Sequence, residues 1–289
     1  MYSVIDQLAV GAGFSVSVLC ETLSVSRSGL YAWRDERETS RDQRDQELMA
    51  LIQDIFWRHK RRYGARRIAE ELSSRDEPCG VARVARLLKT QGLRAIQPKS
   101  YRPRTTQSRH TLGYSPNLLA GRSAATRTNE VWVGDITYVR LRRKGFGYLC
   151  LLMDLYSRRI VGWEFSEEMT EPLVLSTLRL AIRVRQPPAG LIHHSDRGGQ
   201  YAGKRYRGVL RRAKMLQSMS GANNCYDNAF IESCFGTIKI ELEMVEYENS
   251  GEAIRELSSY ISYYNVERRH SSLGYLNPME FETQHATQN

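Results

Sequence analysis

The pattern of apolar and polar positions changes near residue 130, which divides the chain into a helical first part and an α/β second part. Before this point, apolar residues recur every three or four positions, as at Leu48, Leu51, Ile52 and Ile55, and this is the period of amphipathic helices. After it, apolar runs rich in β-branched and aromatic residues alternate with short turns, as strands do. The pattern therefore predicts two kinds of domain.

The first 35 residues predict a short helix-turn-helix segment. Ser26 is placed to cap the second helix, and Leu30 and Trp33 fall on one face of it. Arg27, next to the cap, is a predicted DNA contact.

Residues 43–95 predict a helical DNA-binding domain of three helices. Its third helix carries basic residues beside its apolar stripe, as helix-turn-helix DNA modules do. The alternative is a small bundle whose charges are simply solvated. The predicted DNA contacts of this domain are Arg66, Arg67, Arg83, Arg86 and Lys89.

The next segments are a predicted basic linker over residues 96–129 and an α/β core over residues 130–245. The linker is rich in Pro, Ser, Thr, Arg and Gly and is expected to be extended. The core opens with three strand-like runs, Val131–Leu141, Tyr148–Tyr156 and Arg159–Phe165, whose short turns favour an antiparallel meander.

A helix, a strand, a helix, a short strand and further helices then follow in the core. This is the element order of a ribonuclease-H-like domain, so the expected fold is a mixed five-stranded sheet flanked by helices. Residues 246–289 are expected to form a C-terminal helix and tail.

The charge of the chain points to an acidic polymer as its partner. Its 289 residues include 42 Lys and Arg against 32 Asp and Glu, for a net charge of +10. A basic protein can also be merely soluble, but here many of the cations gather between Arg58 and Arg104. This clustering favours nucleic acid.

The compartment is expected to be the cytoplasm, with association to the bacterial nucleoid. No signal peptide is recognisable, and no apolar run approaches the roughly 18 residues that a membrane span needs. The five cysteines are scattered without zinc-finger spacing, as in a protein whose thiols stay reduced.

Three carboxylates stand where an acid is out of place. Asp135 interrupts the first strand, Asp196 ends an apolar run before a Gly-rich turn, and Glu232 lies on a predicted helix that begins near Asn228. Isolated buried carboxylates are costly unless they are paired or hold a metal, so three from different elements predict one metal site. Two Mg²⁺ ions about 4 Å apart would suit phosphoryl transfer there, with Mn²⁺ as a substitute.

Each acid also has an ordinary interpretation. Asp135 can cap an edge strand, Asp196 can be a turn residue and Glu232 a surface acid of a helix. Two further acids are expected to have other roles: Asp154 is structural, and Asp227 caps the helix of Glu232.

DNA contacts are predicted on both sides of the acids. Asn228, Glu232, Gly236 and Lys239 share one stripe of a helix, and Lys239 is placed to reach a DNA phosphate. Three residues beside Asp196 are expected to position DNA: Arg197, Gln200 and Tyr201. At least one of His193 and His194 is expected to be a hydrogen-bonded core residue, and the other to orient a ligand or contact phosphate.

Several motifs resemble the orfB-type transposase of the third family of bacterial insertion sequences, whose catalytic core is similar to that of retroviral integrases. They are Trp132-Val-Gly-Asp-Ile-Thr-Tyr138, Asp154-Leu-Tyr-Ser-Arg-Arg-Ile-Val-Gly-Trp163, His193-His-Ser-Asp-Arg-Gly-Gly-Gln-Tyr201, Asn224-Cys-Tyr-Asp-Asn-Ala229 and Arg268-Arg-His270. Two loops depart from the family pattern, at Gly199 and at Gly221-Ala-Asn.

The resemblance implies a DDE transposase that cuts double-stranded DNA at terminal inverted repeats and joins the freed 3′-OH to target DNA. It implies catalytic roles for Asp135, Asp196 and Glu232 and DNA contact by Lys239. It also implies a homo-oligomer on DNA and an upstream orfA-type partner with a helix-turn-helix and a leucine zipper, which is usually fused to this protein by a frameshift.

Two other functions remain open on the sequence. The first is a catalytically idle DNA-binding protein, although such a protein has no need of three placed acids. The second is a nuclease acting on RNA–DNA hybrids, which the basic helical domain disfavours.

Overall fold

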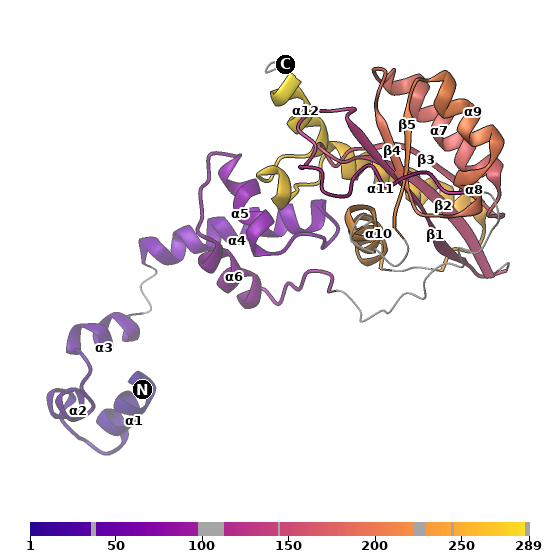
Figure 1. The fold of residues 1–289 in the computed structure, drawn as a ribbon. Coiled ribbons are helices and arrows are strands. Elements are labelled where there is room, and N and C mark those ends of the chain that lie inside the picture. Colours follow the sequence, from indigo (N-terminus) through magenta and orange to yellow (C-terminus); the bar gives the residue numbers. More distant parts are fainter. Residues whose placement is uncertain (36–38, 98–112, 144, 222–228, 244–245, 287–289) are drawn as a thin grey trace. The chain divides into compact units, whose positions relative to one another are not determined.

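A computed structural model describes residues 1–35, 39–97, 113–143, 145–221, 229–243 and 246–286. The chain forms two compact units, Met1–Arg94 and Ala95–Asn289 (Figure 1). The first contains only helices in its described residues, and the second contains the sheet.

The first three helices form a small cluster of their own. They are α1 (Tyr2–Gly11), α2 (Val16–Thr22) and α3 (Arg27–Arg34), and they bury Ile5, Cys20 and Leu30. Ser26 caps α3 as predicted, since its Oγ accepts a hydrogen bond from the Gly29 backbone N–H at 2.9 Å. Trp33 is 43% exposed, so Leu30 alone of the predicted pair is a core residue.

The predicted three-helix unit consists of α4 (Ser40–Arg58), α5 (Ala65–Ser73) and α6 (Val81–Thr90). Helix α4 begins at a capping box, in which Thr39 and Asp42 satisfy each other's backbone N–H groups. Apolar residues at helical spacing, including Leu48 and Ile52, are fully buried.

The second unit is built on a five-stranded mixed sheet in the order β3-β2-β1-β4-β5. Strands β1 (Val131–Leu141), β2 (Gly145–Asp154) and β3 (Ile160–Ser166) pair antiparallel. Strands β4 (Ile192–Ser195) and β5 (Leu216–Met219) continue the sheet in parallel pairing from β1. This is the ribonuclease-H-like core that the order of elements predicts.

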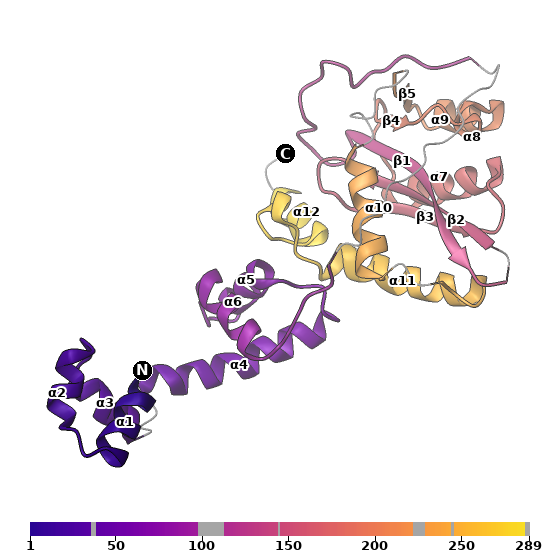
Figure 2. The same ribbon diagram turned by 90° about the horizontal axis from the view of Figure 1, so that it is seen from below.

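Helices cover both faces of this sheet (Figures 1 and 2). On one face, Trp132 packs in a core with α7 (Glu171–Arg185), α8 (Gly199–Ala202) and α9 (Lys204–Arg212). On the other, Val131 and Val133 pack against α10 (Ala229–Glu241) and α11 (Ser250–Val266). Alternate residues of β1 therefore face opposite cores, and odd-numbered ones face α10.

The residues after 245 pack as part of this unit. Ala253, Leu257 and Tyr260 of α11 belong to the same buried cluster as Val133 of β1. The last helix, α12 (Pro278–Ala286), carries Glu282, which accepts hydrogen bonds from Arg159, Arg185 and Ser157.

Part of the predicted linker is held against the sheet. The hydroxyl of Ser115 lies 2.9 Å from Gln217 Oε1, and the backbone N–H of Leu118 donates to Ser218 Oγ at 2.9 Å. The segment from residue 113 is therefore bonded to the β5 strand, which differs from a free basic linker. Residues 98–112 lie outside the described part.

The structure describes two features on which the predicted compartment depends, the state of the cysteines and the character of the helices. Cys20, Cys79, Cys150 and Cys234 are free thiols. None of the described helices has the length and apolar character that a bilayer crossing requires.

Candidate active site

Strands β1 and β4 bring Asp135 and Asp196 to the same edge of the sheet. In their parallel register, Gly134 stands opposite Ser195. Asp135 is the next residue of β1, and Asp196 follows directly after the end of β4. Each carboxylate is held locally. Oδ1 of Asp135 accepts from the Ile136 N–H at 2.8 Å, and Oδ1 of Asp196 accepts from the Gly198 N–H at 2.9 Å.

The residue before Asp135 on the central strand is a glycine, Gly134. A Cβ at this position would lie 2.6 Å from Leu152 Cδ2 and 3.2 Å from His193 Nε2. The space beside Gly134 is therefore filled by the side chains of Leu152 and His193 from the two neighbouring strands.

The charges of the predicted site act on one another. Burial, together with the charge of Asp196 and more weakly that of Glu232, raises the pKa of Asp135 to about 8, and the Ile136 N–H and Lys239 oppose this rise. Two other acids and one lysine therefore influence the Asp135 carboxylate. A set of hard oxygen donors with excess negative charge suits a divalent cation.

Glu232 is the outer member of the set. It lies in the first turn of α10 and is exposed, because Ile231, Phe235 and Ile238 form the face of the helix that packs on the sheet, as predicted. Within the described residues, no group of three or more His, Cys, Asp or Glu side chains is close enough to hold a metal ion. Asn228 and Asp227, just before α10, lie outside those residues.

Lys239 and Gly236 extend the site along α10. Lys239 is half-buried, and burial lowers the pKa of its ammonium, an effect that Asp135 opposes. A Cβ on Gly236 would meet no atom within 4 Å. The helix surface between Glu232 and Lys239 is thus open at the glycine, as a close approach of DNA requires.

The side chains of the loop after β4 are placed differently from the DNA contacts that the sequence predicts. Arg197 donates from Nε to the Ser220 carbonyl at 2.8 Å and stacks its guanidinium on Tyr114 at 4.7 Å from the ring centroid. Gln200 is partly exposed. Tyr201 is only 1% exposed and packs edge-on against Tyr206. Its prediction as a DNA contact does not fit this burial, because α8 turns the ring into the core.

Three polar residues near the acids have structural roles. Both histidines are fully buried: His193 Nε2 lies 2.8 Å from the Tyr206 hydroxyl, and His194 Nδ1 lies 2.8 Å from Ser218 Oγ. The idea that one of the two contacts DNA phosphate is therefore wrong. Asp154, also fully buried, accepts from the backbone N–H groups of residues 129, 156 and 157, as its structural assignment predicted.

Some cations of the helical unit contact other residues of the chain, and some are exposed to solvent. Arg83 and Arg86 both form ion pairs with Asp45 of α4, at 2.7 and 2.5 Å. Asp45 is not among the predicted functional residues, although an acid on the apolar side of an amphipathic helix is a signal for such a partner. Arg67 donates to the Arg62 carbonyl and lies over the Tyr63 ring. Four predicted DNA contacts are exposed, namely Arg27, Arg66, Arg86 and Lys89, and Arg86 is exposed despite its ion pair.

Comparison with known proteins assigns families to both units. The family described as "Integrase core domain" matches residues 125–225, and a second family of the same description matches residues 213–278. The family described as "HTH-like domain" matches residues 43–101.

Two relatives are similar over nearly their whole lengths. The uncharacterized 31 kDa protein of insertion element IS600 from Shigella sonnei is 42% identical over 265 residues, covering 91% of this chain and 97% of the relative. Transposase InsF for insertion sequence IS3A from Escherichia coli strain K12 is 40% identical over 275 residues, covering 94% and 95%. Among solved structures, the HTLV-2 integrase catalytic core domain in complex with magnesium matches at 15% identity with a TM-score of 0.44, covering 54% of this chain and 97% of that one.

Proposed function

The chain belongs to the IS3 family of insertion-sequence transposases, which carry an integrase core domain, and we propose that Asp135, Asp196 and Glu232 are the acids with which it cuts and joins DNA. The observation that supports this assignment most directly is the parallel register of β1 and β4, which sets two aspartates side by side at one edge of the sheet. Glu232 faces outward from the helix that covers this face.

We propose that Asp135 and Asp196 bind divalent metal, with Glu232 completing the set when DNA is bound. Their oxygen-only donor set and mutual repulsion fit Mg²⁺ or Mn²⁺. Two such ions would activate the attacking oxygen and stabilise the leaving one at the phosphorus. The protein's own part is to hold the carboxylates in place through the Gly198 and Ile136 N–H groups.

Lys239 is proposed to bind a phosphate next to the one that reacts. Its side chain is close enough to Asp135 for the two charges to interact, so a phosphate bound at the acids lies within its field. Binding to Lys239 and to the metal together would orient the DNA strand for in-line attack. Gly236 lets the strand approach the helix between them.

The helical unit is proposed to recognise the terminal inverted repeats. Its exposed cations Arg66 and Lys89 are available to phosphates, whereas Arg83 and Arg86 would have to exchange Asp45 for DNA. Joining two element ends to a target also requires more than one catalytic core, so a homo-oligomer is part of the proposal. An upstream orfA-type protein would supply the leucine zipper.

The proposal is tested by metal-dependent cleavage and joining of DNA that carries the element's own ends. Asp135→Asn, Asp196→Asn and Glu232→Gln should each abolish both steps while DNA binding persists. Glu168→Gln removes an exposed acid of the same unit and should leave both steps unchanged. Full activity in any of the first three variants would exclude that residue from the site.

Metal binding is tested separately by the shift in melting temperature on adding Mg²⁺ or Mn²⁺ without DNA. A ligand that binds only the folded protein stabilises it, so the wild type should show a shift that Asp135→Asn lacks. An equal shift in both proteins would place the ion elsewhere.

A further inference from the structure

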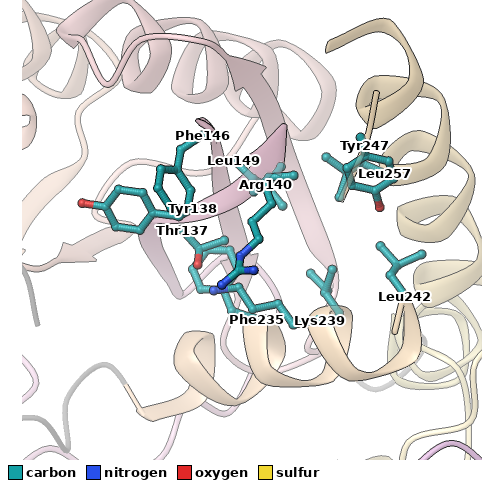
Figure 3. A pocket seen from close by; sticks show the side chains of 12 residues that line it. Thr137, Tyr138, Arg140, Phe146, Leu149, Phe235, Lys239, Leu242, Tyr247 and Leu257 are labelled. Atoms are coloured by element: carbon teal, nitrogen blue, oxygen red, sulfur yellow. The ribbon is translucent and has the colours of Figure 1, made fainter. Parts of the chain in front are cut away.

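A cavity of about 140 Å³ lies between the end of the β1–β2 hairpin and helices α10 and α11 (Figure 3). Its apolar lining comes from Leu149 of β2, Phe235 and Ile238 of α10, and Leu257 of α11. All four side chains are well buried, so these walls are fixed by the core.

The cavity adjoins the acids along two elements. On β1, Thr137 and Val139 line it and follow Asp135 at two-residue steps, which puts them on the same face of the strand. On α10, Lys239 lines it two turns beyond Glu232. A DNA strand whose phosphate is held at the acids would therefore pass next to the cavity.

The rim of the cavity is aromatic and basic. Tyr138 and Phe146 are 47% and 50% exposed, and their rings meet edge to face with centroids 5.8 Å apart. Because the two exposed rings contact each other, they form one apolar patch at the rim. Arg140 extends from β1 toward α10 (Figure 3) and, with Lys239, adds positive charge.

We propose that the cavity receives one unpaired nucleobase of the DNA substrate, next to the phosphate held at the acids. This proposal rests on the acid site proposed above. Nucleobases combine a flat apolar ring with an anionic backbone, so the aromatic rim and apolar walls suit the base while Arg140 and Lys239 suit its phosphates.

The size of the cavity selects one ring. A dry protein cavity of about 150 Å³ holds a molecule of benzene, so a volume of about 140 Å³ accepts a single six-membered ring. Unstacking a base from the duplex costs a few kcal/mol, and stacking of that base on aromatic side chains offsets this cost. Insertion would also fix the strand in register with the acids.

The inference is tested by pairing a protein variant with a DNA variant. Binding of element-end DNA is measured with EDTA present, so that no cleavage occurs, on duplexes in which each nucleotide around the cut is replaced singly by an abasic one. In the wild type, one such replacement should weaken binding about 10-fold, the value of one lost base stack.

Val139→Phe fills the cavity with a ring and keeps a residue suited to a strand. With this variant, the sensitive abasic position should change binding less than about 2-fold. Because the base can no longer enter the filled cavity, removing it loses no contact there. Val184→Phe, at an exposed site of α7, is the matched control and should keep the full dependence. Phe146→Ala alters only the exposed rim, and should reduce the dependence if Val139→Phe does not fold.

Two results would overturn the inference: a scan in which no abasic position weakens binding, or full dependence in both Val139→Phe and Phe146→Ala. Neither result depends on catalysis, because binding is measured without metal. Wild-type cleavage with Mg²⁺ is recorded in parallel. If the acid-site proposal is wrong, the wild type does not cleave the DNA. If the base-cavity proposal is wrong, the protein variants do not change the effect of the abasic position.

Discussion

Arg268 forms a buried ion pair with Glu241, the last residue of helix α10. Its Nη2 donates to Glu241 Oε1 at 2.7 Å, and its Nε lies 3.0 Å from both carboxylate oxygens. The Tyr260 hydroxyl donates to the same carboxylate at 2.9 Å. The end of α10 is therefore fixed by a charged network, whereas its first turn, with Glu232, is exposed.

Arg268→Met should lower the free energy of unfolding by about 3–5 kcal/mol, because it leaves the Glu241 carboxylate buried and unpaired. Urea unfolding measures the change. The double variant Arg268→Met/Glu241→Leu removes both charges and should recover most of the loss. If the double variant is no more stable than the single one, the pair contributes through packing instead.

Asp135→Asn should abolish DNA cleavage and yet stabilise the metal-free protein, by about 1–3 kcal/mol. The reason is that Asp135 is a half-buried acid whose pKa is raised by burial and by the charges of Asp196 and Glu232, and the amide carries no charge to be repelled. Unfolding is measured in EDTA and activity with Mg²⁺. If the metal-free variant is less stable than the wild type, the carboxylates of the wild-type site do not repel one another.

Asp154→Asn should have the opposite effect on stability. Both oxygens of Asp154 accept backbone N–H groups, and an amide can replace only one of them. A buried N–H without an acceptor costs about 1–3 kcal/mol, which thermal or urea unfolding detects. Equal stability to the wild type would show that the turn after β2 rearranges to find new acceptors.

His193 should make the protein sensitive to mild acid. Burial, with a smaller effect from the charge of His194, lowers the pKa of His193 to about 3 in the folded state, against about 6.5 in the unfolded chain. The unfolded state therefore binds the extra proton between these values. The contribution of the neutral ring is complete above pH 6.5 and falls by about 1.4 kcal/mol per pH unit below it.

The measurement is unfolding free energy from pH 7 to pH 4 for the wild type and His193→Gln, whose amide can still meet the Tyr206 hydroxyl. The difference between the two curves isolates the histidine. Parallel curves would show that His193 does not account for the acid sensitivity.

Gly236→Ala should stabilise α10 by about 0.5–1 kcal/mol, since alanine is the better helix former and its Cβ meets no atom within 4 Å. The same substitution should weaken binding of element-end DNA if a strand passes over the glycine. Gly208→Ala in α9, where a Cβ would contact only Arg212 Nη1, at 3.7 Å, is the control for stability and should leave DNA binding unchanged. Unaltered binding in Gly236→Ala would remove α10 from the DNA path.

The sequence predicts the fold of the second unit well, because its strands alternate cleanly between two cores. Val131–Leu141 is predicted to the residue. The order of elements then fixes which strands carry the acids. Helix α12 is missed because its few apolar residues form no clear stripe; what holds it is Glu282 with its arginines.

Side-chain roles are harder to predict, because they depend on partners far away in the sequence. Local context places Tyr201 in a DNA-contacting loop, but the ring packs on Tyr206. Arg83 and Arg86 look free on their helix until Asp45, about 40 positions earlier, is brought beside them. The base-sized cavity likewise needs residues of β1, β2, α10 and α11 together, and no single segment signals it.

The ion pair of Arg268 with Glu241 also bears on how the protein is made. A ribosome delivers strands β1 to β3 and the helix of Glu232 before it delivers Arg268, so for a time Glu241 has no cation to meet it. A nascent chain at that stage, or one truncated before residue 268, has all three proposed catalytic acids but lacks the cation that fixes the end of α10. We therefore expect the capacity to break DNA to arise only after Arg268 has been made and has paired with Glu241.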